Sequence, residues 1–214
     1  YTNGIGAFNS GFGQEALFSN SSGYSNSAFG YYALRLTTGQ YNTAVGSGSL
    51  QSNTTASNNT AVGYQAGYSN TTADENVAIG ASAMESNTTA GAGTAVGYRA
   101  LYANTTGTEN TAVGRTALNS NTTGYYNAAV GRGALQANVT GALNTAMGTF
   151  ALFQNTASYN TAVGYQAGNT NTTGAYNAAL GAQALYLNTT GSNNTALGGF
   201  TLYDNTTGAS NVAV

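Results

Sequence analysis

The pentapeptide Asn110-Thr111-Ala112-Val113-Gly114 decides the fold of this chain, because close variants of it recur along the whole sequence. Its glycine has counterparts at Gly13, Gly30, Gly46, Gly63, Gly80, Gly97, Gly131, Gly148, Gly164, Gly181 and Gly198. The steps are 17 residues long, except from Gly30 to Gly46 and from Gly148 to Gly164, where they are 16. A unit this short cannot fold alone, so each repeat is predicted to form one turn of a solenoid.

The repeats predict one continuous array over residues 1–214. Its start, residues 1–10, is irregular, and the recognisable repeats run through residues 9–214. We expect a single repeat domain that is a segment of a longer fibre protein.

Composition excludes several classes of function. Charged residues make up 5% of the chain, the net charge is −2, and the positive charges are four scattered arginines, so no basic stripe for nucleic acid exists. Apolar residues make up 41% and fall at fixed positions, which indicates a folded chain. No apolar run reaches the ~18 residues needed to cross a bilayer, so we expect no membrane insertion. Cysteine is absent, which rules out a disulfide framework.

The local pattern predicts the path of one coil. Alternation in Thr-Ala-Val before each glycine is typical of a short β-strand. Four residues after glycine comes a second apolar column, which predicts a second strand: Leu17, Leu34, Leu50, Met84, Leu101, Leu118, Leu135, Leu152, Leu185 and Leu202. Asn-Thr-Thr-Gly, as at Asn104–Gly107, then predicts a turn. The fold class is therefore all-β, a parallel β-solenoid (β-roll) of about twelve 17-residue coils stacked about 4.8 Å apart.

The apolar columns remain to be placed inside or outside the coil. We assign the Val and Leu columns to the interior, which puts the alanine before Val, such as Ala61 and Ala112, on the opposite strand face. A small residue kept on an outer face predicts close approach by another surface, and two further copies of the chain would supply it as a homotrimer. The alternative is that alanine only fits a tight bend inside the coil.

The repeats resemble a known group of fibres. Asn76-Val77-Ala78-Ile79-Gly80 and the Asn-Thr-Ala-Val-Gly copies are similar to the head repeats of trimeric autotransporter adhesins and to repeat arrays of phage tail-fibre proteins. The resemblance covers residues 9–214 and implies a left-handed β-roll, three intertwined chains and attachment at a cell or virion surface. The period here is longer than in those adhesin heads, and the extra residues fall in the Asn-Thr-Thr turn.

Two asparagine columns are candidate functional positions. The first, which precedes Thr-Ala-Val, is interpreted as a structural ladder of stacked amides: Asn42, Asn59, Asn76, Asn110, Asn127, Asn144, Asn160, Asn177 and Asn194. The second forms Asn-x-Ser/Thr sequons at the turns, and these are candidate glycosylation sites: Asn53, Asn70, Asn87, Asn104, Asn121, Asn138, Asn171, Asn188 and Asn205. Alternatively, Asn-Thr-Thr serves turn geometry and the sequons are incidental.

Tyrosine is enriched to sixteen residues, without tryptophan. The rows one and five residues after glycine are predicted to point outward and to bind sugars or a neighbouring fibre: Tyr64, Tyr68, Tyr98, Tyr102, Tyr165, Tyr186 and Tyr203. The other explanation is stacking between coils that stiffens the rod.

Catalysis is not expected, because the chain lacks His, Cys and Lys and its few carboxylates do not repeat. No cofactor or metal is predicted. Ice binding is a less favoured function. A flat ice-binding face needs threonine at positions i and i+2 on one strand face, whereas here the strand threonines alternate with valine. The sequence thus predicts a structural and adhesive part of an extracellular, cell-surface or virion fibre. Its partners would be itself, as a homotrimer or end-to-end filament, and a cell-surface or glycan receptor; a self-assembling, glycosylated extracellular filament is the alternative.

Overall fold

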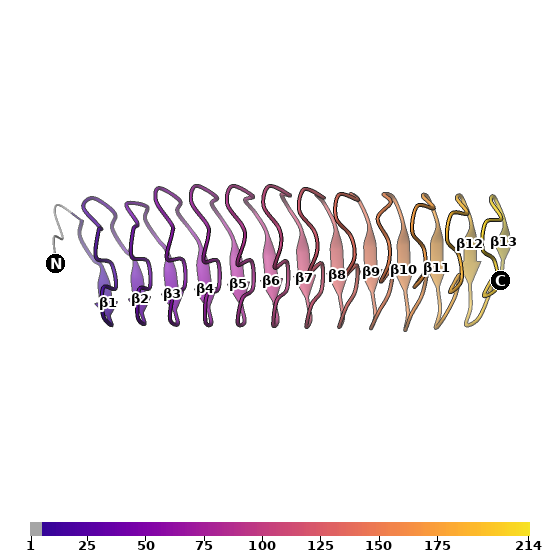
Figure 1. Ribbon diagram of the computed structural model, residues 1–214, viewed down its shortest axis with the longest axis horizontal. Coiled ribbons are helices and arrows are strands. Elements are labelled where there is room, and N and C mark those ends of the chain that lie inside the picture. Colours follow the sequence, from indigo (N-terminus) through magenta and orange to yellow (C-terminus); the bar gives the residue numbers. More distant parts are fainter. Residues whose placement is uncertain (1–5) are drawn as a thin grey trace. The chain divides into compact units, whose positions relative to one another are not determined.

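The computed structural model describes residues 6–214, and none of these residues is helical. The chain divides into two compact units, Tyr1–Glu109 and Asn110–Val214. In each unit the backbone winds as a β-solenoid and contributes one short strand per coil to a parallel sheet (Figure 1). The predicted parallel β-solenoid of about twelve turns is confirmed.

The first unit holds six strands, which lie side by side in chain order: β1 (Ser10–Phe12), β2 (Ser27–Phe29), β3 (Thr43–Val45), β4 (Thr60–Val62), β5 (Val77–Ile79) and β6 (Thr94–Val96). The second unit holds seven: β7 (Thr111–Val113), β8 (Ala128–Val130), β9 (Thr145–Met147), β10 (Thr161–Val163), β11 (Ala178–Leu180), β12 (Thr195–Leu197) and β13 (Val212–Ala213).

The register between strands follows the repeat. Thr43 of β3 pairs with Thr60 of β4, and the same column-to-column pairing holds for the strand pairs within each unit. Coils also bond outside the strands; for example, Leu50 N donates to Ala66 O at 3.0 Å. Because the backbone donors and acceptors are used by the coils above and below, the chain is stabilised as a stack rather than coil by coil.

The segment after the glycine is a tight turn, and the prediction of a second strand there is wrong. Leu50 and Met84 have φ near +50°, in the left-handed region. Ala33 and Leu34 are adjacent and both buried, whereas neighbouring residues of a strand point to opposite faces. The turn therefore directs two consecutive side chains into the interior, where the Leu column is buried as predicted.

The strand faces are also opposite to the prediction. Ala44 is fully buried, whereas Val45 is 39% exposed, and the other complete repeats have the same order, with Val96 and Val163 half-buried. The interior is too narrow for a larger central residue: a Cβ added at Gly11, in the alanine column, would lie 3.2 Å from Leu17 Cδ1. The Val column thus lies outside, and alanine is kept small by the coil's own Leu column.

The repeat glycine is required by the coil above it. Gly80 has a φ of +129°, and a Cβ there would lie 2.6 Å from the carbonyl oxygen of Gly97. No real Cβ makes such a contact with backbone, so the corner can carry only glycine. This explains why Gly is the most regular element of the sequence.

The two shortened coils lose one residue in the Asn-Thr-Thr turn. Thr37 replaces the turn asparagine in the first, and its Oγ1 accepts a hydrogen bond from Asn53 Nδ2 at 3.0 Å. Asn155 keeps its place in the second, but its Nδ2 donates to Ala157 O, two residues ahead. The Oδ1 of Asn138, one coil earlier, is buried and has no hydrogen-bond partner among the described residues.

Candidate functional site

The outer face of the sheet carries two columns of side chains in each unit. One is the residue that begins each strand, most often threonine, and the other is the residue before the repeat glycine, which is Val, Ile, Leu, Met or Phe. Val62 and Ile79 in the first unit and Leu180 in the second are more than a third exposed. No charged residue occupies either column in the described strands.

This outer sheet face is comparable in extent to the apolar patches that often carry function on other proteins. Six strands of three residues cover a footprint of about 300 Å² in the first unit, from strand spacing and rise per residue. The largest apolar patches on monomeric proteins reach ~300–600 Å² and are often functional. Sequence analysis missed this face because it placed Val inside. The prediction that the Ala column contacts another chain is corrected: those alanines are enclosed by their own coil.

The first asparagine column forms a ladder inside each unit. Asn42 Oδ1 accepts hydrogen bonds from the backbone N and from Nδ2 of Asn59, at 3.0 and 3.2 Å. The same pair of bonds joins Asn127 to Asn144. All nine predicted members are buried: Asn42, Asn59, Asn76, Asn110, Asn127, Asn144, Asn160, Asn177 and Asn194. Because their polar groups are used inside the coil, they cannot form a surface site.

The sequon asparagines form a second internal ladder, which sequence analysis did not foresee. Asn70 Nδ2 donates to Asn53 Oδ1 at 2.9 Å and to Ala73 O at 3.0 Å, and Asn70 Oδ1 accepts from Asn87 Nδ2. Eight members are buried: Asn53, Asn70, Asn87, Asn104, Asn121, Asn138, Asn171 and Asn188; Asn205 is half-buried. The sequon asparagines recur once per repeat, as those of the first ladder do, and this shared period was the sequence signal for a second ladder.

Burial of these amides contradicts their assignment as glycosylation sites of the folded chain. A glycan is carried on Nδ2, and in this ladder Nδ2 points into the coil and donates two hydrogen bonds, as in Asn188. A sugar at this atom would break both bonds and occupy the core. The sequons at Asn53, Asn70, Asn87, Asn104, Asn121, Asn138, Asn171, Asn188 and Asn205 thus serve the interior of the turn.

The predicted tyrosine rows lie at the glycine corner and divide into two groups. Tyr64, Tyr98 and Tyr165, one residue after glycine, are exposed, whereas those five residues after glycine are half-buried: Tyr68, Tyr102, Tyr186 and Tyr203. The guanidinium carbon of Arg99 lies 4.8 Å from the ring centroid of Tyr102 and 5.4 Å from that of Tyr98. The rings of Tyr186 and Tyr203 stack between coils, as the stiffening alternative predicts.

The first unit also has an open groove of about 410 Å³ lined by Asp74, Glu75 and Glu109. Asp74 Oδ1 accepts a hydrogen bond from the backbone N of Ser57, which occupies one carboxylate oxygen. No group of three or more His, Cys, Asp or Glu suited to a metal ion occurs among residues 6–214. The groove is therefore an exposed acidic surface rather than a built site.

No family model, curated protein or solved structure matches this chain. Within the described residues, no helix is long and apolar enough to cross a membrane. The outer sheet face is the main functional candidate because it is regular, exposed and free of charged side chains in its strand columns.

Proposed function

We propose that this chain is the repeat region of an extracellular or virion surface fibre, in which copies of the chain pack together through the outer sheet face. The observation that carries the proposal is the column of Val, Ile, Leu and Met on the outer sheet face of each unit, which is mostly exposed and has no charged residue in the strand columns beside it. An identical chain presents the same columns at the same spacing, so packing two faces removes apolar surface from water without burying a charge.

The proposed number of copies is three. It rests on the similarity of the Asn-Thr-Ala-Val-Gly repeats to the heads of trimeric autotransporter adhesins, a resemblance carried by residues 9–214. In such a homotrimer the glycine corners and the Asn-Thr-Thr turns stay exposed. The fibre would then attach to a cell-surface or glycan receptor through repeated weak contacts, with the exposed Tyr64, Tyr98 and Tyr165 as candidate contacts.

The mass of the particle in solution tests the proposal. We expect sedimentation equilibrium to give three times the 21.5 kDa chain mass. Val62→Lys and Val130→Lys, on the outer sheet face, should give monomers with an unchanged far-ultraviolet spectrum, because lysine on that face buries an unpaired charge at the interface. Thr72→Lys, on an exposed turn, is the matched control and should stay trimeric. A monomeric parent chain at micromolar concentration would overturn the proposal; filaments in electron micrographs would replace the trimer with end-to-end assembly.

A second candidate is ice binding, and one observation favours it. Val62 was expected in the interior, but it points outward from β4 on the same face as Thr60, and the same holds along the sheet in each unit. The face is thus a regular array of hydroxyl and methyl groups about 4.8 Å apart along each column. A monomeric chain that shows thermal hysteresis, lost in Val62→Lys, would support this candidate; no hysteresis would exclude it.

A further inference from the structure

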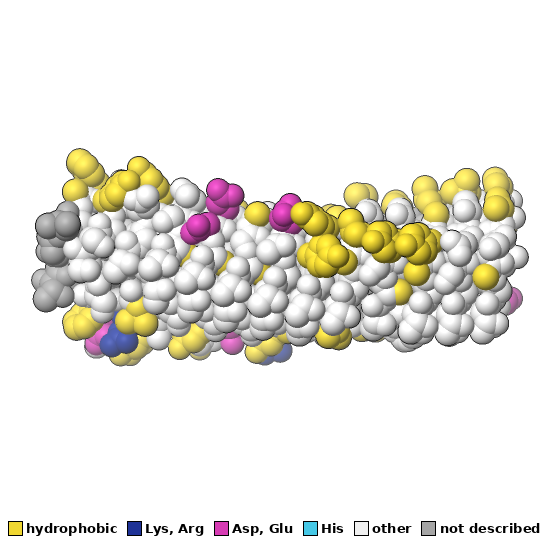
Figure 2. Space-filling model, turned by 90° about the horizontal axis from the view of Figure 1, so that it is seen from above, with side chains coloured by type: hydrophobic (Ala, Val, Ile, Leu, Met, Phe, Trp, Pro, Cys, Tyr) yellow, Lys and Arg dark blue, Asp and Glu magenta, His cyan; other side chains and the backbone are white. Residues whose placement is uncertain are grey.

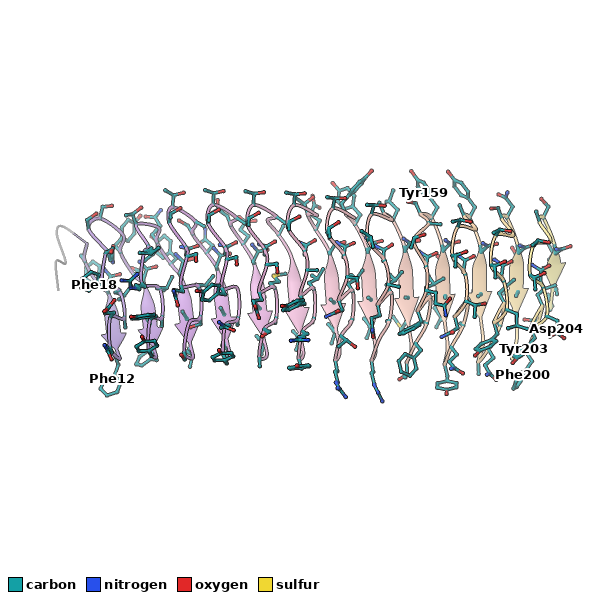
Figure 3. All side chains as sticks on the ribbon, in the orientation of Figure 1. Phe12, Phe18, Tyr159, Phe200, Tyr203 and Asp204 are labelled. Atoms are coloured by element: carbon teal, nitrogen blue, oxygen red, sulfur yellow. The ribbon has the colours of Figure 1, made fainter. Side chains whose placement is uncertain are left out.

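Tyrosine rings of the second unit are stacked in pairs across neighbouring coils. The ring centroids of Tyr159 and Tyr176 lie 4.8 Å apart with 4° between the ring planes. Those of Tyr186 and Tyr203 lie 5.1 Å apart with 9° between planes. Figure 3 shows Tyr159 and Tyr203 pointing outward from opposite edges of this unit. Each pair joins residues 17 positions apart, one coil above the other.

The backbone holds both pairs in register. Leu187 N donates to Tyr203 O at 3.0 Å, which fixes the segment of Tyr186 against that of Tyr203. Thr161 N donates to Asn177 O at 2.8 Å and Asn177 N donates to Asn160 Oδ1 at 2.9 Å, which fixes the segment of Tyr159 against that of Tyr176. The rings therefore meet because their coils are stacked, and they stay neighbours for as long as the coils stay paired.

The Tyr159–Tyr176 pair is exposed to a reagent in solution, and Tyr186 and Tyr203 are half-buried. Tyr159 and Tyr176 are 47% and 59% exposed. Hydrophobic side chains form a row on the face of the molecule that Figure 2 draws. Tyr159 and Tyr176 both have φ near +60°, a conformation that costs roughly 1–2 kcal/mol for a residue with a Cβ. The equivalent positions have nearly the same φ but carry varied residues, such as asparagine at Asn58 and leucine at Leu143. The backbone at this position therefore does not favour tyrosine over other side chains.

We propose that Tyr159–Tyr176 and Tyr186–Tyr203 are sites of oxidative cross-linking, in which each pair forms one dityrosine bond between successive coils. The oxidant is hydrogen peroxide, used by a haem peroxidase. Each phenol gives one hydrogen atom, as an electron and a proton, to the oxidised peroxidase, and the two phenoxyl radicals couple through the ring carbons ortho to oxygen. Each ring then transfers its ortho hydrogen to restore the phenol. Two tyrosines and one hydrogen peroxide give one carbon–carbon bond and two water molecules.

The spacing of the coils suits this bond. Rotation of the stacked rings about their Cβ–Cγ bonds turns the two ortho carbons toward each other, and a small further approach of the rings completes the bond, because their Cα atoms are about 4.8 Å apart. The link leaves the backbone hydrogen bonds between coils in place. It converts a noncovalent contact between two coils into a covalent one in a chain that has no cysteine for disulfides.

Other tyrosines provide internal comparisons. Tyr165 is 53% exposed, but its column carries Thr149 in the coil before and Ala182 in the coil after, so it has no ring to couple with. Tyr31 and Tyr32 stack closely but are neighbours in the chain, and a bond between them joins no coils. If exposure alone governed oxidation, Tyr165 would be cross-linked as readily as the stacked pairs. If stacking between coils governs it, the links form at the stacked pairs.

The full 214-residue chain, treated at high dilution with a haem peroxidase and hydrogen peroxide, tests the proposal. We expect each link to lower the mass of a single chain by two hydrogen atoms, and peptide sequencing by mass spectrometry to find Tyr159 joined to Tyr176 and Tyr186 joined to Tyr203. Links at these pairs should exceed links at Tyr165 by at least tenfold, and the preference should vanish in concentrated urea.

Two variants complete the experiment. Tyr159→Phe combined with Tyr203→Phe should abolish both links, whereas Tyr165→Phe should leave them unchanged. Far-ultraviolet spectra before oxidation establish that the variants fold, and a small photochemical one-electron oxidant repeats the measurement without the bulk of an enzyme. The proposal is overturned if, with both oxidants, the folded chain links Tyr165 as often as the stacked pairs or links mainly between separate chains.

Discussion

Removing one asparagine from the second ladder should weaken the solenoid at a defined coil. Asn70 is 1% exposed, and its Nδ2 donates to Asn53 Oδ1 and Ala73 O, at 2.9 and 3.0 Å. Asn70→Ala removes the donor and leaves Asn53 Oδ1 buried and unpaired, whereas Ala73 O keeps only the longer hydrogen bond from Asn76 Nδ2 at 3.5 Å. An unpaired buried acceptor costs about 1–3 kcal/mol and a lost hydrogen bond about 1 kcal/mol, so the free energy of unfolding should fall by about 2–4 kcal/mol.

The loss should be confined to the neighbouring coils. In a solenoid each repeat is stabilised by its own contacts and by its immediate neighbours, so one weakened interface splits the array. Asn87 is affected less than Asn53, because its Nδ2 keeps a second acceptor in Ala90 O at 3.0 Å. Amide hydrogen exchange followed by mass spectrometry should therefore show lost protection around Asn70 and normal protection several coils away.

The comparison with an exposed threonine decides whether the ladder is responsible. Thr72→Ala changes a side chain on the surface of the same turn and should alter the free energy of unfolding by no more than about 0.5 kcal/mol. Urea unfolding, followed by far-ultraviolet circular dichroism, measures both variants. If Asn70→Ala is no more destabilising than Thr72→Ala, the ladder does not hold the coils together and the assignment fails.

Three further changes test other parts of the fold. Gly80→Ala should cost several kcal/mol in a thermal melt, because its Cβ would lie 2.6 Å from backbone; a melt like that of the parent chain would contradict the corner geometry. One threonine inserted after Thr156 restores the 17-residue coil and lets Asn155 Nδ2 reach the unpaired Oδ1 of Asn138, so stability should rise by about 1 kcal/mol rather than fall. Hydrogen bonding to Tyr24 raises the pKa of the Tyr41 phenol, so Tyr24→Phe should lower that pKa in a spectrophotometric titration.

The coil and its period were predictable because they depend on local chemistry that repeats. Glycine at the corner, a three-residue strand and an Asn-Thr-Thr turn each leave a distinct mark in the sequence, and parallel stacking at equal spacing follows from their regularity. The amide ladder that includes Asn42 and Asn59 was predictable for the same reason, since equal side chains at strand spacing meet their own copies.

The roles of Asn70 and of the leucine segment were not predictable from local pattern. Asn-Thr-Thr has the same composition whether its asparagine points to solvent or into the coil, and only the closed coil brings Asn70 onto Asn53. Ala33 and Leu34 resemble part of a strand by composition, but their burial together requires the left-handed turn seen at Leu34.

The sequence by itself determined a solenoid of 17-residue turns, because every repeat carries the same glycine, asparagine and apolar positions. Tertiary structure alone decided which way each strand faces. Ala61 and Val62 are both apolar, so their alternation is compatible with either face, and only the width of the closed coil, set by the Leu column opposite, admits alanine and leaves valine outside. The surface proposed for self-association therefore follows from the limited space inside one coil.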